Sequence, residues 1–276
     1  MMNGRRVSSL GASALKYWAI GVITAKSSLA YITDTVLRQV FLVVIIFTFS
    51  QLWSVTYRVT GQSTIAGFSV TQMLWYLVLT EAITLGQVRA AAAMDDDVKS
   101  GQIAYTLSRP YNFILYHYAT YIGETLVRIP ANIILGGAVA SLTVGLIRFS
   151  IASVLVGTLS VVLGTTLHFV VSAGIGLLAF WFEETQSFYL LYSRVALLLG
   201  GVMLPLELMP TPVQRVAAVL PTRYMIYEPA RIFTGHVQAS GAAPLLLRQV
   251  AWIAVFSIVL NLVYRQGVKH ASVQGG

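Results

Sequence analysis

The sequence predicts an all-α polytopic membrane protein with six transmembrane helices, and its composition and hydropathy pattern are the reasons. Of the 276 residues, 57% are hydrophobic and only 10% are charged. A soluble domain is about 45–50% apolar and about 25% charged. A hydrophobic core needs no such excess, so much of the apolar surface must face lipid. No stretch between the apolar runs is large enough for a second domain, and we treat residues 1–276 as one transmembrane domain.

The N-terminal segment, residues 1–31, predicts an interfacial helix. Its apolar stretch from Tyr17 to Ala25 is too short to span a bilayer, and Lys16 and Lys26 bracket it closely. No clean small-residue cleavage site follows, which argues against a signal peptide. Aromatic and basic side chains both favour the head-group region. We expect this helix to lie on the cytoplasmic surface of the membrane.

Six later segments meet the length of about 20 apolar residues that a bilayer core requires. They are residues 32–54, 70–92, 127–147, 150–181, 188–209 and 244–264. Six crossings place both termini on one side of the membrane. Most of the 18 Lys and Arg residues fall on that side, so the termini are predicted to be cytoplasmic.

Several classes of function are disfavoured by what the sequence contains. The formal charge of +8 comes from Lys and Arg residues scattered at the ends of apolar runs, a pattern typical of membrane topology and not of nucleic-acid binding. Cysteine is absent, and the four histidines form no H-E-x-x-H pattern. No catalytic or metal-binding residues are therefore predicted. The chain also lacks a G-x-x-x-x-G-K-[ST] phosphate-binding loop, so it is not an ATPase of that kind.

The connection between the second and third spans, residues 95–126, is the most informative polar segment. Its acidic run should start a helix, because negative charge stabilises a helix N-terminus. A glycine then allows a sharp bend, and an Arg-Pro pair breaks the chain again. An aromatic-rich pattern beyond the proline predicts a further helix at the membrane surface. The residues concerned are Asp95, Asp96, Asp97, Lys99, Gly101, Arg109 and Pro110.

Two interpretations of this connection stay open from the residues alone. A short charged helix on the cytoplasmic face is suited to receive force from a partner protein. The same pattern also fits a solvated loop with an acidic cap. Glu124 and Arg128, four residues apart, are expected to form an ion pair just before the third span.

A second irregular segment covers residues 205–235. Pro205 and Pro210 interrupt the fifth span, and a short amphipathic piece follows and ends at Pro221. Broken helices at membrane depth are tolerated only where they are buried in protein or line a cavity. We therefore expect this segment to fold back onto the protein.

Two ionisable residues fall inside predicted spans, Glu81 in the second and His168 in the fourth. Such residues are functional candidates because burying them in a bilayer is costly. Their similar depth allows a Glu81–His168 contact. Glu81 either faces a translocation pathway and favours cationic cargo, or is paired or protonated between helices.

These patterns resemble the permease subunits of ABC-2 type exporters, in the six-span form that works beside a separately encoded ATPase. The matching residues are an acid followed by Lys99-Ser100-Gly101, then Leu107-Ser108-Arg109-Pro110 after the second span, and Gly200-Gly201 with Leu220-Pro221 in the later irregular segment. The resemblance implies that residues 95–126 contain a coupling helix that docks on the ATPase. It also implies that residues 205–235 form an outer re-entrant hairpin, with the prolines at its gate.

The resemblance further implies the partners and the location. Two permease subunits, identical or homologous, would form the pathway together with two copies of the ATPase. Mg-ATP would bind to the ATPase, and this chain would hold no cofactor. The complex would lie in the bacterial inner membrane and export a hydrophobic substrate, drug-like or lipid-like, as in multidrug efflux. The alternative reading is a secondary transporter that uses Glu81 as its coupling acid.

Overall fold

The computed structural model describes residues 3–30, 32–107, 109 and 111–274. Over these residues the regular structure is helical, apart from one isolated bridge between Ile65 and Phe68. Five regions are long and apolar enough to cross a membrane: Gln39–Thr60, Val70–Lys99, Phe113–Val144, Ile151–Phe180 and Ala243–His270. The chain is therefore an all-α, multi-pass membrane protein, as the composition predicts.

These regions correspond to five of the six predicted spans. They belong to α2 (Ile32–Thr60), α3 (Val70–Gly86) with α4 (Ala90–Lys99), α6 (Phe113–Val144), α7 (Ile151–Gly176) with the short 3₁₀ turn η1 (Leu177–Phe180), and α12 (Ala243–Gln274). The predicted span at 188–209 is not one continuous helix. α8 covers Gln186–Leu199, and a non-helical stretch follows it.

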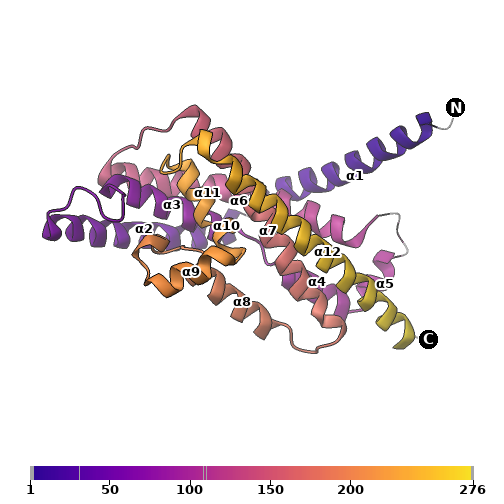
Figure 1. The fold of residues 1–276 in the computed structure, drawn as a ribbon. Coiled ribbons are helices and arrows are strands. Elements are labelled where there is room, and N and C mark those ends of the chain that lie inside the picture. The colour runs from indigo at the N-terminus through magenta and orange to yellow at the C-terminus, as the bar shows by residue number, and fades with distance from the viewer. Residues whose placement is uncertain (1–2, 31, 108, 110, 275–276) are drawn as a thin grey trace.

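The bundle is organised around α3 and α7. Every residue of α3 from Met73 to Ile83 is buried, with α2, α6 and α11 (Tyr227–Phe233) packed around it. α7 packs against α4, α10 (Thr222–Met225), α11 and α12. Figure 1 shows α12 crossing the bundle along α7, with α10 and α11 beneath it.

α1 (Asn3–Ala30) confirms the predicted N-terminal helix, which packs against the first half of α6. The two backbones touch at a pair of glycines, since a Cβ placed on Gly123 would lie 2.4 Å from the Gly21 carbonyl oxygen. The Asn112 N–H also donates to the Tyr17 hydroxyl at 2.8 Å. Figure 1 shows α1 projecting from one end of the bundle. Its place on a membrane surface remains a prediction.

α6 corrects the prediction of a separate surface helix after Pro110. The helix runs unbroken for 32 residues, with Pro130 in its interior, and contains both the aromatic stretch and the third span. Phe113, His117 and Tyr121, spaced four apart, are all buried. Phe113 stacks on Tyr264 of α12. The aromatic residues thus form a buried helix face.

The acidic run also lies differently from the prediction. Asp95, Asp96 and Asp97 lie in the second half of α4, near its C-terminus, instead of opening a helix. α4 begins earlier, at Ala90, because a run of alanines favours helix and allows a close approach to α7. A Cβ on Gly176 would lie 2.5 Å from the Ala91 carbonyl oxygen. This packing outweighs the preference of acidic residues for a helix N-terminus.

The predicted irregular segment is a series of short helices: η2 (Leu206–Leu208), α9 (Thr211–Val219), α10 and α11, followed by η3 (Ala239–Gly241) before α12. Pro205, Pro210 and Pro221 each occupy the position just before a helix, at η2, α9 and α10. The prolines therefore separate one helix from the next, as the sequence indicates. The fixed φ of proline favours the start of a helix, and its missing N–H disfavours continuation of the preceding helix.

A glycine pair on α7 tests the α4–α7 packing. Replacing Gly176 by alanine should lower the free energy of unfolding by about 1–3 kcal/mol, because the added Cβ meets the backbone of Ala91. Gly174→Ala is the matched control, since a Cβ there has no heavy atom within 4 Å. Chemical unfolding in mixed detergent measures both variants. Equal stability of the two would contradict the packing described here.

Candidate functional site

The connection from α4 to α6 is held at several points. Asp95 forms an ion pair with Lys99 at 2.7 Å and accepts a hydrogen bond from the Thr185 hydroxyl at 2.5 Å. Thr185 lies in the link between η1 and α8, so Asp95 fastens α4 to that link. Asp97 lies 3.1 Å from His117 Nε2, which joins α4 to the start of α6. Asp96 is exposed between these two anchors.

A sharp bend follows α4 at Gly101. Its φ of +72° is in the left-handed region, which glycine adopts without steric cost. A Cβ there would meet nothing within 4 Å, so conformation alone requires the glycine. The bend leads into α5 (Gln102–Leu107), a helix of six residues. This confirms the bend that the sequence predicts.

The chain between α5 and α6 is mostly exposed. The guanidinium of Arg109 lies 4.2 Å from the centre of the Tyr105 ring and donates to the Tyr105 hydroxyl. The hydrogen bond to that hydroxyl raises the pKa of Arg109, so its charge is permanent. Asn112 caps α6 by accepting from the Leu115 N–H at 3.1 Å. Pro110, which the sequence also singles out, lies outside the described residues.

The connection contains one short, half-buried helix. In α5, Ile103 and Thr106 are buried, whereas Gln102 and Tyr105 are exposed. The chain before α5 is tied to α6 and to the η1–α8 link, and Asn112 ties the chain after it to α1. The predicted Glu124–Arg128 ion pair also forms, at 2.7 Å, on the first half of α6.

Glu81 and His168 do not form the contact that their depth allowed. His168 Nδ1 lies 3.2 Å from the Tyr121 hydroxyl, and its ring lies beside those of Tyr121 and Tyr192. Both Glu81 and His168 are 4% exposed. Among the described residues, no hydrogen bond or ion pair joins Glu81 to any side chain. The aromatic rings of α6 and α8 occupy the space around the histidine.

His168 lines a cavity. The cavity has a volume of about 320 Å³ and lies between the α3–α4 junction, α7 and α8. Arg89, Tyr189, Tyr192 and Arg194 contribute to its wall together with His168. Two basic residues and no acidic residue therefore face this space.

A buried charge cluster lies in the irregular segment, and sequence analysis missed it. Glu228 is fully buried and accepts from Arg223 Nε at 2.6 Å and from Arg231 at 3.2 Å. Arg231 also lies 3.6 Å from Glu207, to which the Tyr227 hydroxyl donates. The sequence does contain a sign of this cluster, since acidic and basic residues lie close together within an otherwise apolar stretch. Such charges must pair with one another when they are buried.

Backbone contacts fasten the same segment to α3. The Tyr76 hydroxyl donates to the carbonyl oxygen of Gly201, and the Thr80 hydroxyl donates to that of Val202 at 2.6 Å. Gly201 has a φ of +63°, so the turn after α8 needs glycine. These two carbonyl groups accept no backbone hydrogen bond within a helix, and the side-chain hydroxyls donate to them instead. Irregular backbone can be buried inside a helix bundle only when its polar groups are hydrogen-bonded in this way.

Comparison with known families identifies the chain's relatives. A family described as ABC-2 family transporter protein matches residues 40–275. The chain belongs to this ABC-2 family. No curated protein matches the sequence. The matched range contains the membrane-crossing regions of the described chain, with only Gln39 left out. It also contains the α4–α6 connection and the buried charge cluster.

Membership places this ABC-2 protein among membrane components of transporters, which lack ATPase domains of their own. It confirms the resemblance on which the predicted roles depend. The roles of the residues in the α4–α6 connection, of Glu81 and His168, and of the three prolines remain predictions. The structure pairs Asp95 with Lys99 and Asp97 with His117, and it pairs His168 with Tyr121 instead of Glu81.

The buried cluster of the ABC-2 protein is testable through its central carboxylate. Glu228→Gln should destabilise the protein by about 3 kcal/mol, because it leaves two arginines without their shared counter-charge. Glu183→Gln removes an exposed carboxylate and should change stability by less than about 0.5 kcal/mol. Unfolding in mixed detergent compares the two. A stable Glu228→Gln variant would show that the cluster does not hold the segment.

His236 should make stability depend on pH. Burial lowers the pKa of His236, and the charge of Arg231 lowers it further, against smaller opposing effects of Glu207 and Glu228. The unfolded chain therefore binds a proton more readily, and stability is lost as pH falls below about 6.5.

The matched variant is His236→Phe, which keeps the ring stacked on Phe68 at 4.0 Å but cannot titrate. Its thermal midpoint should fall less than that of the wild type between about pH 7.5 and about pH 5.5. An identical fall in the two proteins would assign the pH dependence to other groups.

Proposed function

We propose that this chain is the permease subunit of an ATP-driven exporter whose ATPase is a separate polypeptide. Family membership supports the transporter role. The observation that carries the proposal is the α4–α6 connection, which holds a six-residue helix with Gln102 and Tyr105 exposed and is fastened to the long helices on either side. In this proposal α5 and Arg109 contact the ATPase, and Asp95, Asp97 and Lys99 keep α4 rigid enough to transmit its movement.

Closure of the ATPase pair on ATP would displace α5. Gly101 sets the bend between α4 and α5, and the bonds of Asp95 and Asp97 join α4 to the η1–α8 link and α6. The displacement would then reach α3, α6 and α7 together. The preference of the ATPase pair for ATP in its closed form provides the free energy that shifts the spans between inward- and outward-open states.

The proposal includes six crossings with both termini in the cytoplasm. α8 has 14 residues, which span about 21 Å of the roughly 30 Å bilayer core. The turn that follows, around Gly201, is fastened to α3 through Tyr76 and Thr80, and in this proposal α8 and this turn together make up the fifth crossing. The free ends of α1 and α12 lie on the same side of the bundle as α5 (Figure 1), in keeping with one cytoplasmic face for the termini and the coupling helix.

Residues 205–235 are then the outer re-entrant hairpin, with Pro205, Pro210 and Pro221 at its turns. A second permease, identical or homologous, and two copies of the ATPase complete the exporter in the bacterial inner membrane. The cargo is hydrophobic and drug-like or lipid-like. Exposed apolar side chains on α8, including Phe188 and Leu191, support a hydrophobic partner or cargo on that face.

A secondary transporter with Glu81 as coupling acid is the other candidate. The observation that favours it is a buried carboxylate with no hydrogen bond or ion pair to the described residues. Against it, Glu81 lines none of the cavities described above. A coupling acid must be reached by its ion, and His168 occupies the accessible position instead.

The proposal is tested by purifying the chain from its own membranes in mild detergent. A protein with a phosphate-binding loop should co-purify and hydrolyse ATP. Arg109→Glu should reduce that association at least about tenfold, because reversing a charge at a contact costs several kcal/mol. Quantitative mass spectrometry of the eluted ATPase measures the change.

Arg215→Glu is the control, because Arg215 is exposed on α9, away from α5. It should leave the association unchanged. A wild-type chain that captures no ATPase would overturn the permease proposal. Normal capture by Arg109→Glu would instead move the docking site away from α5 and leave the permease proposal in place.

A further inference from the structure

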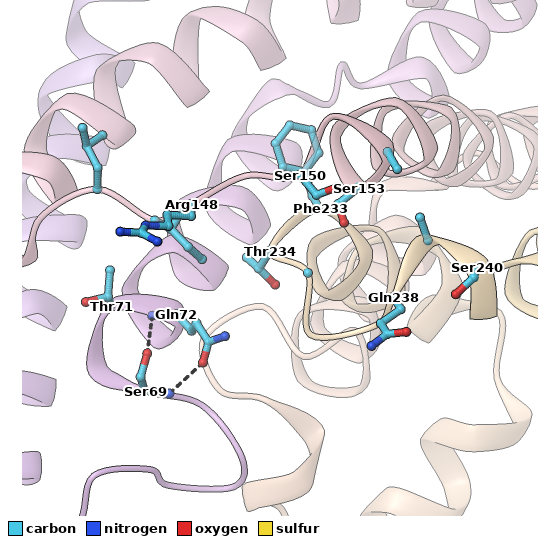
Figure 2. Close-up of a pocket in the computed structure, with 15 residues that line it drawn as sticks. Ser69, Thr71, Gln72, Arg148, Ser150, Ser153, Phe233, Thr234, Gln238 and Ser240 are labelled. Carbon is cyan, nitrogen blue, oxygen red and sulfur yellow. Dashed lines mark hydrogen bonds between the residues drawn. The ribbon is translucent and has the colours of Figure 1, made fainter.

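A polar pocket opens at the end of the bundle opposite α5. It has a volume of about 790 Å³ and lies between the start of α3, the α6–α7 connection, the start of α7 and the α11–α12 connection (Figure 2). Its polar wall includes Ser69, Gln72, Arg148, Ser150, Ser153 and Gln238. One arginine and no acidic side chain line it, so its charge is positive.

The N-terminus of α7 faces this pocket without a cap. Ser150 occupies the N-cap position but its side chain makes no capping hydrogen bond. The first helical backbone bond runs from the Val154 N–H to the Ser150 carbonyl oxygen at 3.0 Å. Within the described chain, the three N–H groups of residues 151–153 therefore have no acceptor. A helix of 26 residues concentrates partial positive charge at such an end.

The start of α3, on the opposite wall, is a helix N-terminus that is capped by side chains. Ser69 accepts from the Gln72 N–H, and the Gln72 side chain accepts from the Ser69 N–H at 3.0 Å (Figure 2). This reciprocal capping box leaves α3 little need of a ligand. The two helix ends thus differ in their third N–H group: in the described chain the Gln72 N–H of α3 has an acceptor, whereas the Ser153 N–H of α7 has none.

Ser153 gives an independent reason to place a ligand here. Its side chain is 5% exposed and lines the pocket, yet its hydroxyl makes no hydrogen bond to any described residue. Its Oγ lies 3.9 Å from the position of a Cβ on Gly235, across the pocket wall. Because Ser153 lines the pocket and its hydroxyl is not taken up by another described residue, that hydroxyl is free to donate to a ligand there.

The connection that carries Arg148 is fixed in place. Trp75 Nε1 donates to the Gly145 carbonyl oxygen at 3.1 Å, where α6 ends. The Phe149 ring meets Trp75 edge-on at 5.1 Å and Phe233 of α11 at 5.8 Å. Arg148 lies between these anchors, and in the described part of the chain its guanidinium has no ion-pair partner. Arg148 is exposed to the pocket, and an arginine there without a counter-charge suits an anionic ligand.

We propose that this pocket binds a phosphate group, either free or on a lipid head group. The Arg148 guanidinium, the free N–H groups at the start of α7 and the Ser153 hydroxyl would all donate to its oxygens. The absence of carboxylates from the lining excludes cationic ligands by charge. The site is separate from the proposed docking of the ATPase and does not depend on it.

Binding is tested on the purified full chain in phosphate-free detergent at constant ionic strength. The probes are inorganic phosphate and dihexanoyl phosphatidic acid, with dihexanoyl phosphatidylcholine as a lipid without an exposed phosphate monoester. Equilibrium dialysis with labelled probe gives the affinity, and the thermal midpoint reports binding to the folded chain. Arg148→Gln should weaken binding about tenfold or more, and Ser153→Ala by a smaller factor.

The control is Arg215→Gln, which removes one positive charge from an exposed site on α9 and should bind like the wild type. Saturable binding of both phosphate probes supports a site for the phosphate itself. Binding of phosphatidic acid alone supports a head-group site. No saturable binding of either probe, or equal binding by wild type and Arg148→Gln, would overturn the proposal.

Discussion

The backbone of α7 is approached closely by three other segments, and each approach occurs at a glycine. A Cβ on Gly157 would lie 2.9 Å from Phe233, one on Gly164 would lie 2.5 Å from the Met225 carbonyl oxygen, and Gly176 meets α4. Lipid tails are as apolar as leucine, so helices in a bilayer gain little from hydrophobic burial and depend on close packing. The positions of α10, α11 and α4 follow from these contacts.

This dependence links the two ends of the molecule. α4 meets the last turn of α7, while α10 and α11 meet its middle and first half. The charge cluster around Glu228 then holds α10 and α11 to one another, and the bonds from Tyr76 and Thr80 hold the preceding turn to α3. Polar contacts inside the bundle fix segments that have too few residues to be held by helix packing alone.

Much of this fold could be predicted from the sequence. Several features depend on local properties of the chain, namely the length of an apolar run, a fixed or permitted φ, and helical spacing. They are the long apolar regions, the breaks at Pro205, Pro210 and Pro221, the bend at Gly101 and the Glu124–Arg128 pair. Each is visible without knowledge of distant residues. The predicted N-terminal helix forms over Asn3–Ala30 for the same reason.

The remaining features depend on residues far apart in the sequence. The acidic run ends α4 because Asp95 and Asp97 meet Thr185 and His117, contacts that local helix preferences do not contain. His168 bonds to Tyr121 instead of Glu81 because an aromatic face of α6 turns inward. The pairing of Glu228 with two arginines likewise follows from the packing of α10 and α11. Tertiary contacts overrode the local signal in each case.

The unbroken course of α6 gives the protein a mechanical element. At 1.5 Å per residue its 32 residues measure about 48 Å, and they join Asn112, beside α5, to the connection that carries Arg148. Pro130 has no N–H to donate to the turn before it, so the helix is most compliant at that residue. An axial push would travel the whole length of this rod, whereas a sideways push would bend it near the middle. α6 is therefore stiffer along its axis than across it, between the segment beside α5 and the connection that carries Arg148.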